Sequence, residues 1–63
     1  MKIKNEYYTL ITGSSEGMGL AFAFEFASIG HNLVLVSNNK QKLIHVKKKI
    51  NKRYDVKVYI NET

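Results

Sequence analysis

Three glycines lie within the eight residues TGSSEGMG, and their spacing is suited to holding a phosphate group. They are Gly13, Gly17 and Gly19, between two apolar stretches of the chain. Where a strand turns into a helix, a first glycine allows the tight turn, a second lets the backbone approach an anion, and a third lets the helix pack against the strand. The N–H groups and the positive end of the helix dipole then face the anion. A glycine-rich turn that holds no ligand is the competing interpretation.

Three segments have the composition of strands that could position this loop. Tyr7–Thr12 is rich in aromatic and β-branched residues and ends at the first glycine. Leu33–Ser37 is a continuous apolar run, which is typical of a buried strand in a parallel sheet. Val56–Ile60 alternates between apolar and polar residues. This alternation predicts a third strand with one more exposed face.

Two helices are predicted between these strands. The first lies in EGMGLAFAFEFASIG, where Ser14 and Ser15 are candidate N-caps and Gly30 stands where a left-handed C-terminal cap falls. Its apolar residues occupy nearly every face, so we expect it to be largely covered. The second lies in NKQKLIHVKKKINKRY, with Asn38 or Asn39 as its cap. Its apolar stripe consists of Leu43, Val46, Ile50 and Tyr54.

The predicted order of elements is β-α-β-α-β, which defines an α/β fold class. Alternating strands and helices indicate a parallel sheet with right-handed crossovers. Two such crossovers in one direction give the strand order 3-2-1 and place both helices on one face. The other face has no helix of its own, although parallel sheets are almost always covered on both faces. We therefore expect half of a larger fold, whose uncovered face would drive self-association in isolation.

Length and composition restrict the class of protein. The 63 residues allow one small domain, and the absence of cysteine excludes a disulfide or a zinc–thiolate site. Two histidines are too few for a structural metal cage, and His31 is expected to be a surface loop residue. His45 is placed on the polar face of the second helix. Because no run of 18 apolar residues and no signal peptide are found, we expect no membrane span and a cytoplasmic location.

The chain is basic, and its charge is uneven. The net charge is +5, and eight of the ten basic residues lie between Lys40 and Lys57. Such a patch can bind nucleic acid through its phosphates. The lysines of an amphipathic helix are more ordinarily a solvated face, and we favour that interpretation, with no nucleic-acid partner. Phe22, Phe24 and Phe26 are interpreted as packing residues and not as a platform for bases.

With a glycine loop that follows a strand and opens a helix, the chain resembles the short-chain dehydrogenases/reductases. The resemblance is carried by LITGSSEGMGLAFAFEFASIGHNLVLVSNNKQKL, the following helix and YDVKVYI, and it is nearest to hydroxysteroid and ketoacyl reductases. It implies that residues 1–63 are the incomplete N-terminal part of an NAD(P)-binding Rossmann domain. The implied parent activity is that of an oxidoreductase, which interconverts an alcohol and a ketone by hydride transfer.

The resemblance also implies a dinucleotide site at the carboxyl edge of the strands. Glu16 is unusual for a pyrophosphate site, because a carboxylate near a pyrophosphate repels it unless the side chain points to solvent. A solvated Glu16 in the first turn, favourable for the helix dipole, is expected. The residues that the resemblance places around the cofactor are Gly13, Ser14, Ser15, Glu16, Gly17, Met18, Gly19, Ser37, Asn38 and Asn39.

The end of the second strand bears on the choice between NADP and NAD. An acid about 20 residues beyond the glycines would bind the ribose 2′-hydroxyl of NAD. Residues 37–40 are Ser-Asn-Asn-Lys, without an acid, and Lys40 and Lys42 are able to meet a 2′-phosphate. Similar NADP enzymes often carry an arginine where Asn38 stands. We favour NADP, with NAD as the alternative.

No catalytic residue can be assigned in this chain. The family uses a tyrosine followed four residues later by a lysine that lowers its pKa. The residues four beyond Tyr7, Tyr8, Tyr54 and Tyr59 are Ile11, Thr12, Val58 and Thr63. Asn61 and Glu62 are also no convincing substitute for the acid that holds the adenine. We expect an inactive fragment that lacks its C-terminal half, or a truncated product; a small, self-associating α/β interaction module is the alternative.

Overall fold

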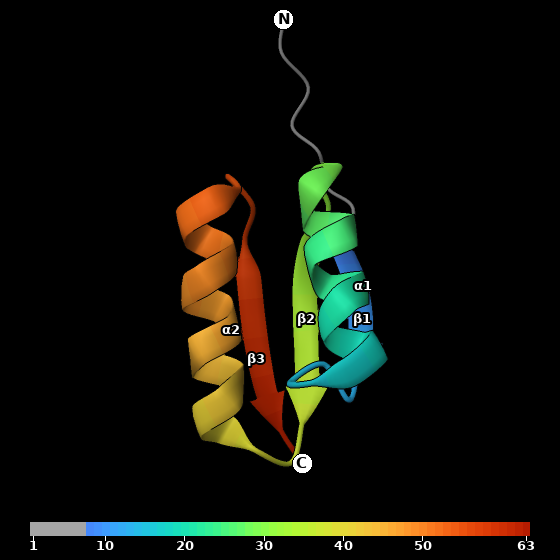
Figure 1. The fold of residues 1–63 in the computed structure, drawn as a ribbon, viewed down its shortest axis with the longest axis vertical. Helices are drawn as coiled ribbons and strands as arrows, with labels where there is room; N and C mark the ends of the chain where they lie inside the picture. The colour runs from blue at the N-terminus through green and yellow to red at the C-terminus, as the bar shows by residue number, and fades with distance from the viewer. Residues whose placement is uncertain (1–7) are drawn as a thin grey trace, which may run out of the picture.

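Three parallel strands form one sheet, and two helices cover one of its faces (Figure 1). The computed structural model describes residues 8–63, so Tyr7, the predicted start of the first strand, lies outside the described residues. The strands lie in the order β1-β2-β3, which confirms the α/β fold class and the predicted order 3-2-1. The elements are β1 (Tyr8–Thr12), α1 (Gly17–Ser28), β2 (Asn32–Ser37), α2 (Lys40–Arg53) and β3 (Val58–Glu62).

The third strand lies two residues further along the chain than predicted. Its pairing with β2 begins at Leu33 opposite Val58, so the prediction of Val56–Ile60 was wrong at both ends. The connection before it is held by Lys57, whose N–H donates to Asn32 Oδ1 at 2.9 Å and whose carbonyl accepts from the Leu33 N–H at 2.8 Å. These bonds align the chain before the ladder starts, and alternation alone contains no information about this register.

The core lies between the sheet and the two helices. Leu33 and Leu35 of the central strand are fully buried under α1 and α2. From α1 only Ala23 and Ala27 are buried, and these small side chains let the helix approach the sheet closely. From α2 the predicted stripe is confirmed, with Leu43, Val46 and Ile50 buried and Tyr54 half-buried at the end of the helix.

The first helix is covered less completely than its composition predicted. Met18 and Phe22 are exposed, because α1 packs only against β1, β2 and α2. The sheet face opposite the helices is also open in residues 8–63, with Tyr8, Leu10 and Tyr59 exposed. Self-association through this face stays a prediction.

The ends of the first helix differ from each other. At its C-terminus Gly30 has φ +91°, and the N–H groups of Gly30 and His31 donate to the carbonyls of Ala27 and Phe26 at 3.0 and 3.1 Å. These bonds form a Schellman motif, and the positive φ of Gly30 confirms the predicted left-handed cap. At its N-terminus the predicted serine caps were wrong, because Glu16 occupies the N-cap position and its side chain makes no capping hydrogen bond.

The second helix is capped by Asn39, whose Oδ1 accepts a hydrogen bond from the Lys42 N–H at 3.1 Å. We expect Asn39→Ala to lower the free energy of unfolding by about 1 kcal/mol, because the cap satisfies a donor that the helix leaves unpaired. Asn38→Ala is the matched control, since Asn38 is exposed and precedes the cap. Urea unfolding of both variants measures the difference, and equal stabilities would contradict the assignment.

Candidate functional site

The glycine loop connects the carboxyl end of β1 to the start of α1. Gly13 and Gly17 have φ values of +62° and +63°, in the left-handed region that favours glycine. Gly19 is needed for a different reason, since a Cβ there would lie 2.3 Å from the Gly13 carbonyl oxygen. A Cβ on Gly17 would meet nothing within 4 Å, so its backbone borders open space. Gly13 therefore allows the tight turn after β1, Gly17 leaves the backbone open to an approaching anion, and Gly19 lets α1 pack against the end of β1.

The start of α1 presents the chemistry of an anion site. The helix has no side-chain N-cap bond, and its first turn contains no acidic residue. The first N–H groups of a helix have no partner within the helix, and the helix dipole is positive at this end. The site can thus offer backbone donors and partial positive charge to a phosphate.

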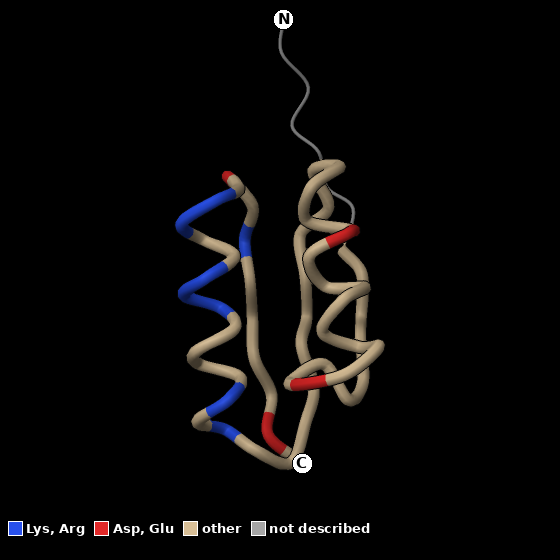
Figure 2. The backbone as a smooth tube through the Cα atoms, in the orientation of Figure 1, with Lys and Arg blue, Asp and Glu red and all other residues tan. Residues whose placement is uncertain are grey.

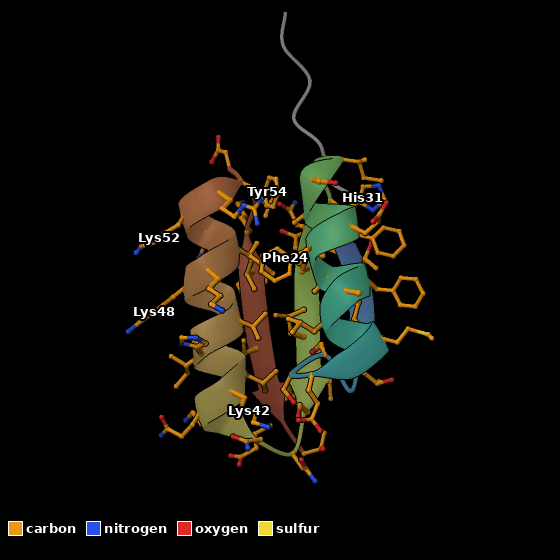
Figure 3. The ribbon with its side chains drawn as sticks, in the orientation of Figure 1. Phe24, His31, Lys42, Lys48, Lys52 and Tyr54 are labelled. Atoms are coloured by element: carbon orange, nitrogen blue, oxygen red, sulfur yellow. The ribbon has the colours of Figure 1, made fainter. Side chains whose placement is uncertain are left out.

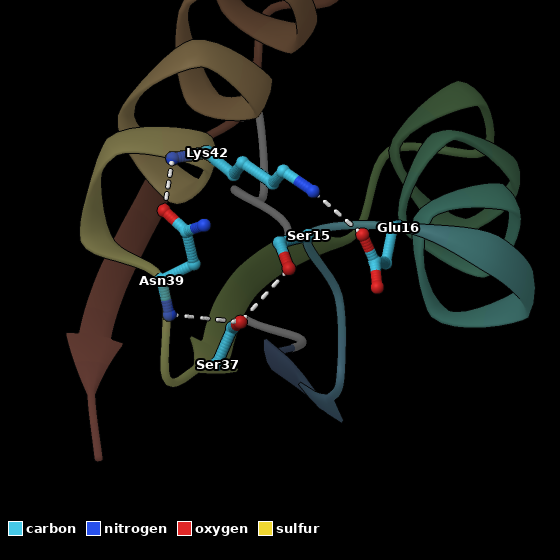
Figure 4. Close-up of polar contacts among 5 residues, drawn as sticks. All are labelled: Ser15, Glu16, Ser37, Asn39 and Lys42. Carbon is cyan, nitrogen blue, oxygen red and sulfur yellow. Dashed lines mark hydrogen bonds and ion pairs between the residues drawn. The ribbon is translucent and has the colours of Figure 1, made fainter.

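Serine hydroxyls connect the glycine loop to the end of β2 (Figure 4). Ser15 and Ser37 share a hydrogen bond of 2.8 Å between their Oγ atoms, and the Asn39 N–H donates to Ser37 Oγ at 3.2 Å. Ser14 is fully buried, and its N–H and Oγ both donate to the Val36 carbonyl, at 3.3 and 3.4 Å. These bonds bring the two predicted groups of site residues to one edge of the sheet.

The predicted site residues consequently divide into buried residues that support the loop and residues that are exposed to solvent. Ser14 and Ser37 are buried and support the loop, and Asn39 caps α2. The exposed members are Glu16 and Met18, together with Asn38, Asn39 and two of the glycines. Glu62 at the end of β3 is in register with Ser37, so its backbone reaches the same edge of the sheet.

Glu16 is paired and not merely solvated. Its Oε1 lies 2.7 Å from Lys42 Nζ, while both side chains stay more than half exposed (Figure 4). The hydrogen bond from Lys42, and then its positive charge, lower the pKa of the Glu16 carboxyl. A lowered pKa means that the pair stabilises the fold above the unfolded-state pKa and loses this effect as the pH falls through the folded value. Sequence reasoning missed this partner because the two residues are 26 positions apart.

The two histidines lie in different places. Figure 3 shows His31 and Lys42 toward opposite ends of the molecule, so His31 is remote from the glycine loop. The expectation of a simple surface residue was wrong, because His31 is half-buried, lies 2.9 Å from Thr9 Oγ1 through Nδ1, and stacks on the Phe26 ring. His45 is exposed on α2, near the loop, and lines a hollow with Ser15 and Lys42.

The basic residues concentrate on α2 (Figure 2). Lys48 and Lys52 point away from the core, as a solvated face would (Figure 3). Of the predicted packing phenylalanines, Phe24 and Phe26 pack against the core, whereas Phe22 is half exposed. Neither helix in residues 8–63 is long and apolar enough to cross a membrane, and within this range no three acidic or histidine side chains gather where they could hold a metal ion. The cytoplasmic location stays a prediction.

Together, the parallel sheet and the glycine loop at its carboxyl edge define an α/β unit of the nucleotide-binding type. The family model for short chain dehydrogenases matches residues 8–63. The chain therefore belongs to the short-chain dehydrogenase family, as the resemblance predicted.

Named relatives and solved structures agree with this assignment. The chain is 46% identical over 57 residues to a very-long-chain 3-oxoacyl-CoA reductase of Vanderwaltozyma polyspora, which covers 90% of the chain but 16% of that protein. A bulky-bulky ketone specific alcohol dehydrogenase from Comamonas testosteroni matches with a TM-score of 0.90 and 32% identity, over 95% of the chain and 24% of that structure. A short-chain dehydrogenase from Sphingobium yanoikuyae in complex with NADPH matches with a TM-score of 0.88 and 35% identity, over 90% and 22%. The chain thus spans less than a quarter of each.

Proposed function

We propose that this chain is the cofactor-binding segment of an NAD(P)-dependent oxidoreductase that interconverts an alcohol and a ketone. The observation that carries the proposal is the left-handed glycine loop leading into an α1 terminus without a side-chain cap. Family membership supports the same function and gives no support to an interaction module. The tyrosine and lysine that perform the proton chemistry would belong to sequence outside these 63 residues. Similarity to the Vanderwaltozyma reductase favours a 3-oxoacyl ketone as the substrate of the longer protein.

The ten predicted site residues are proposed to act in two groups. The loop from Gly13 to Gly19 would surround the pyrophosphate through its backbone N–H groups. The residues from Ser37 to Asn39 would border the adenosine ribose. The bonds of Ser14, Ser15 and Ser37 suit a supporting role, in which their hydroxyls hold the two loops at a constant separation.

NADP is the proposed cofactor, with NAD as the weaker alternative. The end of β2 carries no acid for a ribose 2′-hydroxyl, and Lys40 and Lys42 in the first turn of α2 supply positive charge. The Sphingobium structure, solved in complex with NADPH, supports this choice. The preference is expected to be one of degree, because NAD has every group of NADP except the 2′-phosphate.

The test is a fluorescence titration of the protein that carries residues 8–63 with NADPH and with NADH. We expect both to bind and NADPH to bind more tightly. Gly17→Ala should weaken both by about tenfold, because the new Cβ enters the space that the pyrophosphate would occupy. Gly30→Ala is the matched control, since it places alanine at a similarly positive φ at the other end of α1.

The two variants separate binding from stability. Both are expected to lose about 1–2 kcal/mol of unfolding free energy, the cost of alanine in the left-handed region. Only Gly17→Ala should lose cofactor affinity as well. If the folded wild-type protein binds neither dinucleotide, the proposed function is overturned.

A further inference from the structure

The ion pair between Glu16 and Lys42 joins the two loops that border the proposed cofactor. Glu16 is the residue before α1 and Lys42 lies in the first turn of α2, so the pair links the glycine loop to the start of the second helix. Their separation of 2.7 Å makes this a direct charge-assisted hydrogen bond (Figure 4). The charge of Lys42 is thus compensated before any ligand arrives.

Lys42 is partly exposed and borders a hollow beside the glycine loop. This hollow has a volume of about 220 Å³, lies between the two helices and is also lined by Ser15 of the glycine loop, His45 and Lys49. The titratable side chains that line this hollow are Lys42, His45 and Lys49, and Glu16 is paired with Lys42. Glu16 is the acid among these four residues, so its carboxylate offsets part of the positive charge that a phosphate at Lys42 would meet.

The pair is weak enough to be exchanged. The side chains of Lys42 and Glu16 are 53% and 73% exposed, and ion pairs at such positions contribute little to stability. A phosphate monoester carries a charge of about −1.5 to −2 at neutral pH, against −1 for a carboxylate. A phosphate that reaches Lys42 can therefore displace Glu16 from it.

We propose that Glu16 acts as an internal competitor for Lys42 and thereby lowers the preference of this protein for NADP over NAD. This inference rests on the proposed function, and it concerns the 2′-phosphate alone. In the free protein Lys42 is occupied by Glu16. NADP gains the bond to Lys42 only by releasing the carboxylate, whereas NAD leaves the pair intact. Lys42 is then the residue that determines specificity, and Glu16 is a positioning residue that acts through it.

The experiment is a double-mutant cycle in which the measured quantity is the ratio of the dissociation constants for NADH and NADPH. Binding of NADPH and NADH is measured for the wild type, Glu16→Gln, Lys42→Gln and the double variant, each checked for folding by circular dichroism. Glu16→Gln should raise the preference for NADPH by about fivefold, the effect of one unit charge at about 4 Å in water. Lys42→Gln should lower the preference, and Lys42→Arg should retain it.

Two comparisons make the cycle specific to the pair. In the Lys42→Gln background, Glu16→Gln should leave the ratio unchanged, because its effect passes through Lys42. Glu25→Gln removes the same charge from an exposed position in the last turn of α1 and should also leave the ratio unchanged.

Each other outcome overturns the inference. If Glu16→Gln tightens NADPH and NADH equally, Glu16 acts on the pyrophosphate and not on the 2′-phosphate. If Glu16→Gln also raises the ratio in the Lys42→Gln background, Glu16 acts on the 2′-phosphate directly and not through Lys42. If the wild type binds NADPH and NADH but no variant changes the ratio, the inference falls while the proposed function stands. If the folded wild type binds neither, both fall together.

Discussion

Gly19→Ala is expected to lower the free energy of unfolding by about 3 kcal/mol or more, at the upper end of the cost of overpacking. The new Cβ would lie 2.3 Å from the carbonyl oxygen of Gly13, 2.8 Å from its carbonyl carbon and 3.0 Å from the Cα of Ser14. All three are backbone atoms, so no side-chain rotation relieves the overlap. Relief requires α1 to move away from the end of β1, which also distorts the proposed phosphate loop.

This loss of unfolding free energy is large relative to the stability of the whole domain. Domains are stable by roughly 0.05–0.15 kcal/mol per residue, which is about 3–9 kcal/mol for a chain of this length. Gly19→Ala is therefore expected to leave the protein partly unfolded at room temperature. Urea unfolding followed by circular dichroism measures this.

Gly17→Ala is the matched control for Gly19→Ala, with a smaller expected cost. It adds the same methyl group two residues away, where a Cβ meets nothing within 4 Å. Its cost should be only that of the left-handed backbone, about 1–2 kcal/mol. Should the two variants be equally stable, or their order be reversed, the close approach of α1 to β1 would be wrong.

Leu35→Ala is expected to cost about 2–5 kcal/mol of unfolding free energy. Leu35 is fully buried in the central strand and faces the two helices. Truncating it removes apolar burial and leaves a cavity that rigid neighbours fill only in part. The measurement is the denaturation midpoint at constant m-value.

Leu10→Ala is the matched control for Leu35→Ala. Leu10 is also a strand leucine, but it lies on the uncovered face of the sheet and is 65% exposed. We expect it to cost less than about 1 kcal/mol in a monomer, because little apolar burial is lost. Equal costs for the two leucines in dilute monomer would contradict the assignment of the helix-covered face.

The order of the elements was readable from the sequence because each step has a local physical cause. The continuous apolar run of β2 indicates a strand of a parallel sheet, and Leu43, Val46 and Ile50 recur at the spacing of one helix face. Gly30 stops α1 because only glycine enters the left-handed region easily. The glycine loop was predictable for the same reason, since two of its glycines lie in the left-handed region and the third leaves no room for a Cβ.

The tertiary structure decided what depends on residues distant in sequence. The register of β3 is set by bonds between Lys57 and the start of β2, and alternation could not place it. The serines cap no helix, because Ser14 and Ser15 find partners 22 residues away on β2. His31 was predicted to be a surface residue, yet its Nδ1 reaches Thr9 Oγ1, 22 residues away, only once β1 and α1 pack together.

The proposed site shows the same division. The loop, its glycines and the absence of an acid at the end of β2 were readable from the sequence, because these are local properties of two turns. The fold alone decided that Glu16 faces Lys42, since parallel strands bring the starts of both helices to one edge of the sheet. The charge that a cofactor would meet there depends on groups at the start of both helices, and only folding brings these groups together.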